Sequence, residues 1–394
     1  MTRVSLFVHD LSNNPTVRAV PLAQALAGHF DVEILGFLHG DRDVYQPYRN
    51  LFEYRTLRCP LDMTALLPAL PRLAGMATGD VIYACKPLVP TLGAGLLASG
   101  FGRRRPLLLD VEDDERVPMG TSPRDVLWRD VLKGWRHATA WKYTLAIHGL
   151  VGCAHAVTVS TSRLQARYGG TILRHGPDER MFDPASCPSP TDARRAFNLP
   201  LDVPLALFAG MPQPHKGFAV LRAALADPRC HTWHLVLAGP EGHPEFAACQ
   251  AALGPRCHYL GVVPQERMPV LLRAADVAPV PQLRVRFALS QLPAKALEAM
   301  AMGCPPIASR VSDLPEILGE GARGWLVEPG DADSLAVAMA DAAARPEERT
   351  RRGREARAWF LAHASRAAMT AVLVPLVLQA VDDWTRLRPR GPRR

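Results

Sequence analysis

The sequence predicts an α/β protein of two doubly wound domains in tandem, each a parallel sheet with helices on both faces. The chain has 394 residues, which is more than one ordinary hydrophobic core holds and enough for two. In both halves, short continuous apolar runs alternate with segments of helical spacing, a pattern typical of buried parallel strands joined by helices. A proline-marked connection at 183–190 separates the two halves.

The N-terminal half, residues 1–185, is expected to form the first domain. Its first strand runs into a loop at 11–16, and a helix at 17–27 follows. The expected strands of this domain cover residues 4–9, 32–36, 81–84, 107–111 and 156–160. Each run is short and apolar without a break, so we expect all of them to lie in one sheet that is buried on both faces.

The C-terminal half, residues 186–365, repeats the pattern and is expected to form the second domain. Its expected strands cover residues 205–209, 234–238, 258–260, 277–280, 306–308 and 325–327. Its expected helices cover residues 218–225, 267–275, 293–302, 331–344 and 347–362. Ligands of open α/β sheets bind beyond the carboxyl ends of the strands, so two such domains predict a site in an interdomain cleft.

The last segment, residues 366–394, lies beyond the strands and helices that the second domain requires. We expect a helix at 366–384 that packs back on the N-terminal domain, followed by a basic tail. The tail holds five arginines, and without them the net charge of the chain falls from +8 to +3. A solvated tail is the simplest interpretation, and an anionic membrane surface or an acidic ligand is an alternative partner. No recognised nucleic-acid module is present, so nucleic acid is not expected as a partner.

The sequence favours a cytoplasmic location, with a peripheral position at the inner membrane face as the alternative. The apolar run at 4–8 is too short for a signal peptide. The longest apolar stretches, 145–157 and 369–381, contain polar residues or proline and fall short of the roughly 18 apolar residues that a span needs. None of the eight cysteines forms a Cys-x-x-Cys pair, so we expect small buried side chains and no metal site.

A strand-to-helix turn at 210–217 supplies the first candidate for ligand binding. The strand at 205–209 ends in Gly210, and Lys216 stands just before the next helix. A lysine at such a turn projects to the carboxyl edge of the sheet, where the helix N-terminus adds partial positive charge. The turn is therefore compatible with an anion site, although on this pattern alone a solvated surface lysine is the preferred interpretation.

Two glycine-ended strands come next, with Gly239 in the first turn and Gly261 in the second. Glycine lets the backbone approach a flat ligand closely, so adjacent turns of this kind suit a nucleobase, although each could be an ordinary turn. In the stretch 289–309, Pro293 suits a first helical turn whose free N–H groups can receive phosphate. Glu298 lies further along that helix and can accept both hydroxyls of a ribose, or it can pair with Lys295 instead.

These motifs together resemble the C-terminal domain of retaining glycosyltransferases of family 4, which have the GT-B architecture of two Rossmann-like domains. The resemblance rests on the order and spacing of motifs over about 130 residues. The matching segments are Gly210 with Lys216-Gly217, 238–242, 259–261, 275–277, 298–308, 313–317 and 324–331. A looser similarity at 14–18, 160–164 and 175–184 extends it through the N-terminal half.

The resemblance implies transfer of a sugar from a UDP- or GDP-linked donor to an acceptor hydroxyl, with retention of configuration and without a metal or cofactor. Lys216 would be catalytic, and Glu112 and Asp113 would orient the acceptor or the sugar. The implied first-loop residues on the acceptor side are Asn13, Asn14 and Arg18. The implied donor-binding residues are Gly210, His215, Lys216, Gly239, Glu241, Gly261, Val262, Ser290, Gln291, Leu292 and Glu298.

The chain departs from the family pattern at several positions. Ser290 stands where the family has the first of two paired glutamates, and Met211 stands where an arginine often helps to hold the diphosphate. Arg18, Arg284 or Arg286 could take over from that arginine. An acidic run at 110–115 replaces a family histidine, and we expect it to form hydrogen bonds at the acceptor side rather than to bind a divalent ion.

Two other functions stay open on the sequence. One is a sugar-nucleotide epimerase on the same fold, which the surroundings of Lys216 and Glu298 disfavour. The other is a noncatalytic partner that binds a nucleotide sugar at an altered site, which Ser290 and Met211 favour.

Overall fold

A computed structural model describes residues 1–13, 16–117 and 136–387. The chain divides into two compact units, and each is described here by itself. Unit 1 comprises residues 1–174 together with 366–394, and unit 2 comprises residues 175–365. The boundary therefore falls after Arg174 and not after residue 185, where the sequence analysis placed it. The reason is that Phe182 lies in the core of unit 2, where Arg357 donates hydrogen bonds to the Phe182 carbonyl and to Asp183 at 3.0 and 2.8 Å.

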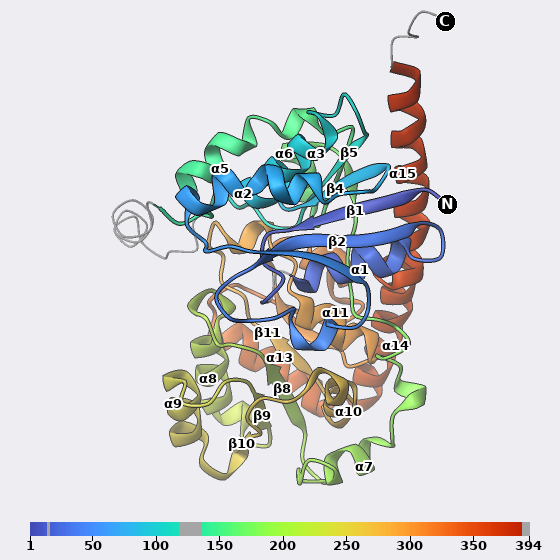
Figure 1. Cartoon of the computed structure of the whole chain (residues 1–394). Helices are drawn as coiled ribbons and strands as arrows, with labels where there is room; N and C mark the ends of the chain where they lie inside the picture. The colour runs from blue at the N-terminus through green and yellow to red at the C-terminus, as the bar shows by residue number, and fades with distance from the viewer. Residues whose placement is uncertain (14–15, 118–135, 388–394) are drawn as a thin grey trace, which may run out of the picture. The chain divides into compact units, whose positions relative to one another are not determined.

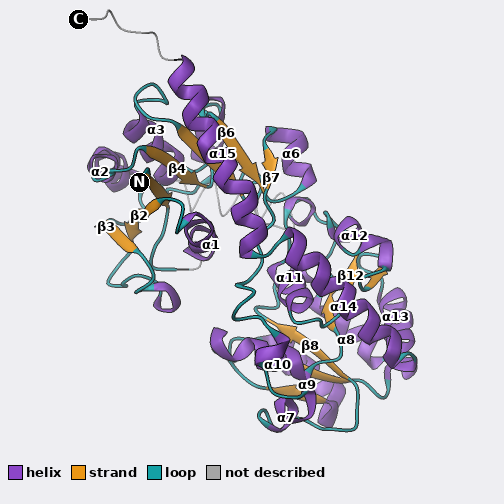
Figure 2. Ribbon diagram, turned by 90° about the vertical axis from the view of Figure 1, so that its right-hand side faces the viewer, coloured by secondary structure: helices purple, strands orange, loops and turns teal. Residues whose placement is uncertain are grey.

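Unit 1 contains a seven-stranded parallel sheet with the strand order β3-β2-β1-β4-β5-β6-β7. The strands are β1 (Arg3–Val8), β2 (Asp31–Leu38), β3 (Glu53–Arg58), β4 (Val81–Cys85), β5 (Leu107–Val111), β6 (Ala156–Val159) and β7 (Thr171–Ile172). The helices are α1 (Thr16–Leu26), α2 (Met63–Gly75), α3 (Ala94–Ser99), α5 (Trp141–His148), α6 (Ser162–Tyr168) and α15 (Arg366–Leu387). Figure 2 shows helices on both sides of these strands, as a doubly wound fold requires.

The C-terminal helix α15 belongs to unit 1 and lies beside α1 (Figure 1). Met369, Leu373 and Val377 are buried in the same core as the side chains of α1. The Thr370 hydroxyl donates a hydrogen bond to the Ala25 carbonyl at 2.8 Å. Among the described residues, the stretch 346–386 is the one helical segment long and apolar enough to cross a membrane. Its α15 part already has a place in the core, so length and composition alone are weak grounds for a span.

Unit 2 contains two three-stranded parallel sheets, β10-β9-β8 and β11-β12-β13. A parallel bridge between Ala206 and Val277 joins their edges, and the Leu207 N–H donates to the Val277 carbonyl at 3.0 Å. The strands are β8 (Leu205–Ala209), β9 (His234–Ala238), β10 (Cys257–Tyr259), β11 (Ala278–Val280), β12 (Pro306–Ser309) and β13 (Trp325–Val327). The helices are α7 (Pro190–Arg195), α8 (Phe218–Ala226), α9 (Pro244–Leu253), α10 (Met268–Ala274), α11 (Ala294–Ala301), α12 (Leu314–Ile317), α13 (Ala332–Ala344) and α14 (Pro346–His363). All strand pairs are parallel, so their carboxyl ends lie at one edge.

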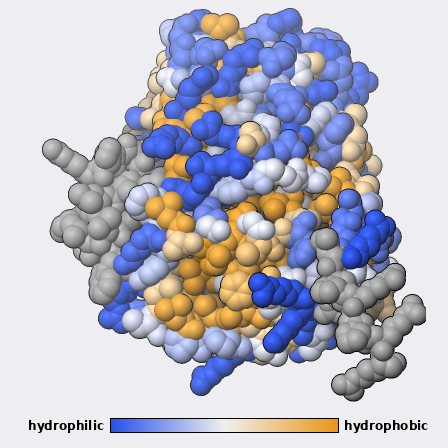
Figure 3. All heavy atoms as spheres, turned by 90° about the horizontal axis from the view of Figure 1, so that it is seen from above, coloured by the Kyte–Doolittle hydropathy of each residue, from blue (hydrophilic) through white to orange (hydrophobic). Residues whose placement is uncertain are grey.

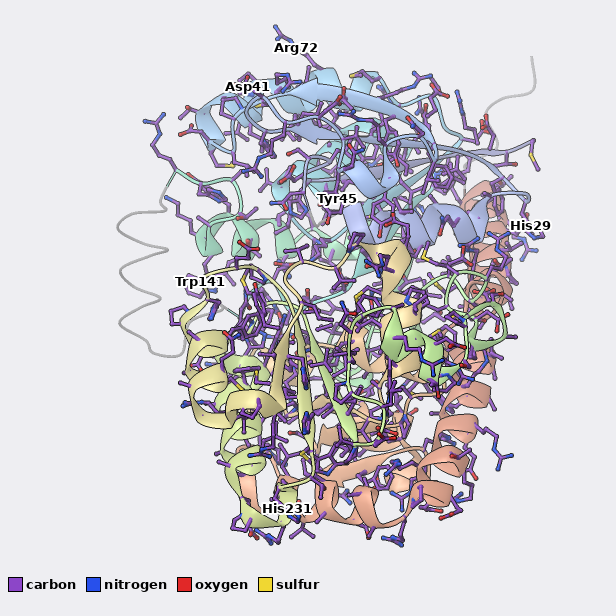
Figure 4. The ribbon with its side chains drawn as sticks, turned by 90° about the horizontal axis from the view of Figure 1, so that it is seen from below. His29, Asp41, Tyr45, Arg72, Trp141 and His231 are labelled. Atoms are coloured by element: carbon purple, nitrogen blue, oxygen red, sulfur yellow. The ribbon has the colours of Figure 1, made fainter. Side chains whose placement is uncertain are left out.

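Unit 1 exposes large apolar side chains on α2, α3 and α5 and within two residues after α3 and α5, and these helices pack on the same side of its sheet. These side chains are Leu67, Leu97, Phe101, Leu145 and Leu150, each between 36% and 54% exposed. Figure 3 views the molecule from above, where these helices lie, and shows apolar residues gathered on that face. Arg72 of α2 extends away from the ribbon in Figure 4, and Arg103 is also exposed. We call this surface the α2–α3–α5 face.

Candidate functional site

The turn that follows β8 is held against the segment that follows β11. The Leu283 N–H donates to the His215 carbonyl at 2.8 Å, and the rings of His215 and Phe287 lie edge to face at 5.5 Å. Gly217 has a φ of +67°, and a Cβ atom there would lie 1.7 Å from the Pro281 carbonyl oxygen. Only glycine fits this position, so the turn between His215 and α8 is fixed by close backbone packing.

His215 and Lys216 both lie at this turn, and burial disfavours the charged form of each side chain. Burial lowers the pKa of Lys216 below its ordinary value. Burial also lowers the pKa of His215, and the positive charges of Lys216 and Lys295 lower it further. The His215 side chain is 8% exposed, and its Nε2 atom has no hydrogen-bond partner among the described residues. A negatively charged ligand would relieve both effects.

Glu298 and Lys295 lie on α11, one turn apart. Burial raises the pKa of Glu298, while a side-chain hydrogen bond with Gln265 and the charge of Lys295 oppose that rise. Glu298 and Lys295 do not form the hydrogen-bonded pair that was the alternative, because the Lys295 ammonium has no hydrogen-bond partner in the part of the chain that the structure describes. Its nitrogen lies 3.5 Å from the centroid of the Phe208 ring. Pro293 is the N-cap residue of α11 and not its first helical residue, so the helix begins one position later than expected.

The segment that leads into α11 is mostly turned inward. Ser290 is 1% exposed, and the Gln291 side-chain oxygen accepts a hydrogen bond from Gln282 at 3.1 Å. Leu292 is 6% exposed and lies in the hydrophobic core of unit 2. The Leu292 side chain is therefore used for packing, and only its backbone is left for a ligand.

Arg284 and Arg286 were expected as replacements for the arginine that Met211 displaces. Arg284 donates a hydrogen bond to the Arg310 carbonyl at 3.2 Å, and Arg286 is exposed.

The two glycine-ended strands meet as the sequence suggested. The Gly239 N–H donates to the Gly261 carbonyl at 2.8 Å, and the Tyr259 hydroxyl donates to the Gly239 carbonyl at 3.2 Å. A Cβ atom on Gly239 would come within 2.9 Å of the Gly210 carbonyl oxygen, so this glycine is required by packing. Glu241 reaches toward Gly261, and Val262 is 73% exposed beside it. Gly210, Gly239 and Gly261 thus lie at one edge of the sheet.

In unit 1 the expected acidic residues surround one largely covered lysine, Lys86, whose side chain is 15% exposed and which the sequence analysis did not name. The Lys86 ammonium lies 3.5 Å from Glu112, 3.2 Å from Asp113 and 2.8 Å from Glu115. Lys86 has a φ of +74°, an uncommon conformation for a residue other than glycine and one that is often found at functional sites. Burial is the main cause that raises the pKa of Asp113 to about 7, and Lys86 opposes it. Within the described residues, no group of three or more histidine, cysteine or acidic side chains could hold a metal ion.

The first-loop residues have different surroundings. Arg18 is 1% exposed and binds the Asp110 carboxylate through two hydrogen bonds at 2.8 and 2.6 Å. Most of this side chain is therefore used inside unit 1, although its Nη1 atom has no partner among the described residues. Asn13 is exposed, and Asn14 lies outside the described residues.

Sequence reasoning missed three residues that the structure brings into these sites: Lys86, Gln265 and, as a ligand candidate, Lys295. Lys86 follows β4 directly, so its position at the end of a strand was the signal that could have found it. The contact between Gln265 and Glu298 joins segments far apart in the chain, so no local sequence pattern could predict it.

Comparisons with known proteins agree with this geometry. Residues 190–359 match the family described as "Glycosyl transferases group 1". D-inositol 3-phosphate glycosyltransferase of Corynebacterium efficiens is 32% identical over 201 residues, 47% of this chain and 45% of that protein. The protein of the same name from Streptomyces griseus is 34% identical over 199 residues, 46% of this chain and 40% of its own length. The chain thus spans about half the length of the curated relatives it matches.

Solved structures with a similar fold cover nearly the whole chain. Sucrose-phosphate synthase from Thermosynechococcus elongatus has a TM-score of 0.70 at 21% identity and covers 97% of this chain and 100% of its own. Anabaena HepE in complex with UDP and glucose has a TM-score of 0.70 at 18% identity and covers 96% of this chain and 100% of its own. The predicted α/β fold with two doubly wound domains of GT-B type is confirmed. Residues 190–359, within unit 2, therefore match the glycosyl transferases group 1 family, as the motifs of this region predicted.

Proposed function

We propose that this protein is a glycosyltransferase that moves a sugar from a nucleoside-diphosphate sugar to an acceptor hydroxyl. One observation carries the proposal. Three basic side chains and one carboxylate, His215, Lys216, Lys295 and Glu298, gather beyond the carboxyl ends of β8 and β11 in a domain of the matching family. Ligands of parallel α/β sheets bind at that edge. The relatives named as D-inositol 3-phosphate glycosyltransferases and the UDP complex of HepE support the same class of reaction.

In this proposal each part of the donor meets a different group. The diphosphate lies against Lys216 and the N-terminus of α11, because both supply positive charge. Glu298 accepts hydrogen bonds from the ribose hydroxyls. The base lies against the turns of Gly239 and Gly261, where the backbone is accessible and Glu241 stands nearby. A panel of UDP- and GDP-linked sugars distinguishes which of the two nucleotides the site prefers.

The proposed reaction proceeds with retention and uses no metal or cofactor. The bond between the anomeric carbon and the diphosphate oxygen breaks, and a bond forms between that carbon and the acceptor oxygen on the same face. The acceptor proton passes to the departing diphosphate oxygen. Negative charge develops on the leaving diphosphate, so preorganised positive groups such as Lys216 stabilise the transition state more than the bound donor.

The acidic residues of unit 1 are proposed to serve the acceptor. Glu112 and Asp113 share the Lys86 ammonium, which holds both carboxylates at the carboxyl end of β5. A carboxylate so placed can accept a hydrogen bond from a sugar or acceptor hydroxyl and orient it. Asn13 follows β1 and is proposed to contribute from the neighbouring loop.

Contact with an anionic membrane surface is proposed as a further property. The α2–α3–α5 face presents apolar side chains beside exposed arginines. Surfaces of this composition bind to membranes that contain anionic lipids. The arginine-rich tail at 386–394 supplies additional positive charge in the sequence. A cytoplasmic protein that docks on the inner membrane face would use both.

A panel of nucleotide sugars tests the proposed function against its alternatives. Thermal unfolding is followed with UDP- and GDP-linked sugars, because a ligand that binds only the folded state raises the Tm. A donor that raises the Tm and is slowly hydrolysed by the purified protein supports a transferase. Stabilisation without any donor hydrolysis or transfer favours a noncatalytic partner, and formation of an epimeric nucleotide sugar favours an epimerase.

A further inference from the structure

The Lys295 ammonium is buried without a hydrogen-bond partner among the described residues, and the proposed function gives this side chain no role of its own. It lies in the first turn of α11, and its nitrogen is fully covered by protein. Among the described residues, no side-chain or backbone oxygen accepts a hydrogen bond from it. The face of the Phe208 ring, 3.5 Å away, supplies the attraction that the structure records for this ammonium.

An ammonium in that position is costly in the protein without a ligand. Lysine provides three donors and usually bonds to a carboxylate or carbonyl oxygen when it is buried. Burial lowers the pKa of Lys295 well below its ordinary value, and the charge of Lys216 lowers it further. The charge of Glu298 opposes this, but the Glu298 side chain is engaged by Gln265. The position therefore fits an additional negative group.

Other polar atoms at the same edge of unit 2 are also unsatisfied. Within the described part of the chain, His215 Nε2 after β8, Gln282 Oε1 after β11 and Ser309 Oγ at the end of β12 are buried and have no hydrogen-bond partner. Native proteins leave few such groups, and each calls for an explanation, such as a ligand or a water. Their common place beyond the carboxyl ends of adjacent strands points to one ligand that bonds to several of them.

We propose that Lys295 binds the diphosphate of the donor together with Lys216, so that two lysines form the cationic part of the donor site. The inference rests on the proposed function. The negative charge of the diphosphate pairs with both ammonium groups and removes the repulsion between them.

The variants Lys295→Met and Lys295→Arg test this inference in the full-length protein. Methionine keeps the unbranched apolar stem and removes the charge, and arginine keeps a charge with a different shape. Calorimetry with UDP and with GDP is expected to give an affinity at least about 10-fold weaker for Lys295→Met and a partial recovery for Lys295→Arg. Uridine and guanosine, which lack phosphate, should show no such difference. Lys142→Met, at an exposed lysine of unit 1, serves as the matched control and should bind as the wild type does.

Stability separates a ligand role from a structural one. Because the ammonium is buried and unpaired, the ligand-free Tm of Lys295→Met should equal or exceed that of the wild type. Nucleotide affinity within about 2-fold of wild type in Lys295→Met, or a large fall in its ligand-free Tm, overturns the inference. If Lys216→Ala weakens nucleotide binding while Lys295→Met does not, only this inference fails. If the wild type binds neither UDP nor GDP, the proposed function itself fails.

Discussion

Arg18 of α1 and Asp110 of β5 form a buried ion pair inside unit 1, with Nε and Nη2 of the arginine 2.8 and 2.6 Å from the two carboxylate oxygens. The side chains are 1% and 0% exposed. The Thr158 hydroxyl donates a third hydrogen bond to Asp110 at 2.6 Å. This pair joins the first helix to the central strands of the sheet and is better placed to hold the fold than to hold a ligand.

Replacement of Arg18 by methionine should destabilise unit 1 strongly. It leaves the Asp110 carboxylate buried with only the Thr158 hydroxyl, and breaking such a pair typically costs about 3–5 kcal/mol. Urea unfolding of the wild type and the variant measures the loss. The double variant Arg18→Met with Asp110→Asn should recover part of it, because no charge is left unpaired. A loss below about 1 kcal/mol in the single variant would show that the pair is not structural.

Lys216→Ala should lower kcat more than it raises the donor KM. If Lys216 neutralises the departing diphosphate, its contribution is larger in the transition state than in the bound donor. The expected loss is about 100- to 1000-fold in kcat, as for removal of one donor from a charge-stabilising site. Lys216→Arg should restore activity only in part, because its planar fork presents the charge differently. Steady-state kinetics with saturating acceptor measures both constants, and a kcat close to that of the wild type would place the diphosphate elsewhere.

Nucleotide affinity should fall as the pH rises, and Lys295→Arg should reduce that fall. The folded-state pKa of Lys295 is lowered, so its ammonium loses the proton at a lower pH than an ordinary lysine does. Binding of the diphosphate favours the charged form, and affinity is therefore highest below the lowered pKa and declines as the pH rises through it. Arginine stays charged throughout. UDP affinities over a pH series that ends below the ordinary lysine pKa of about 10.4 give the comparison. Equal slopes for wild type and variant would contradict the prediction.

Deletion of residues 386–394 should weaken binding to anionic vesicles and leave activity on a soluble acceptor unchanged. The five arginines of this segment each contribute about 1 kcal/mol near such a surface. Leu67→Glu should act in the same direction, because it places a negative charge on the α2–α3–α5 face. Flotation at low salt with anionic vesicles measures binding, and zwitterionic vesicles provide the control. Equal flotation of all three proteins would exclude a membrane role for the tail and the face.

The strands of unit 2 show how far the sequence could predict the fold. Leu205–Ala209, His234–Ala238 and Trp325–Val327 are strands with the bounds expected from their apolar runs. Gly303, with a φ of +68°, ends the segment after α11, as its place in the motif indicated. Strong local signals, an apolar run closed by a glycine turn, were sufficient at these positions.

Other elements gave weak local signals and were missed. The strand β3 (Glu53–Arg58) lies at the sheet edge, has mostly polar residues and is only partly buried, so neither an apolar run nor a regular alternation marks it. The helix α2 contains Pro68 and Pro71, which argue locally against a helix. The lack of a partner for Lys295 depends on how unit 2 folds around it, so the sequence could not reveal it.

The central claim is that unit 2 binds a nucleoside diphosphate through Glu298 and the lysines near it. Calorimetric titration of UDP and of GDP into the wild type, Glu298→Gln and the exposed control Glu266→Gln tests it most directly. The account predicts that at least one nucleotide binds the wild type and the control alike and binds Glu298→Gln at least about 10-fold more weakly, while all three proteins unfold at similar temperatures. Unchanged affinity in Glu298→Gln for both nucleotides, or no binding of either nucleotide by the wild type, would contradict it.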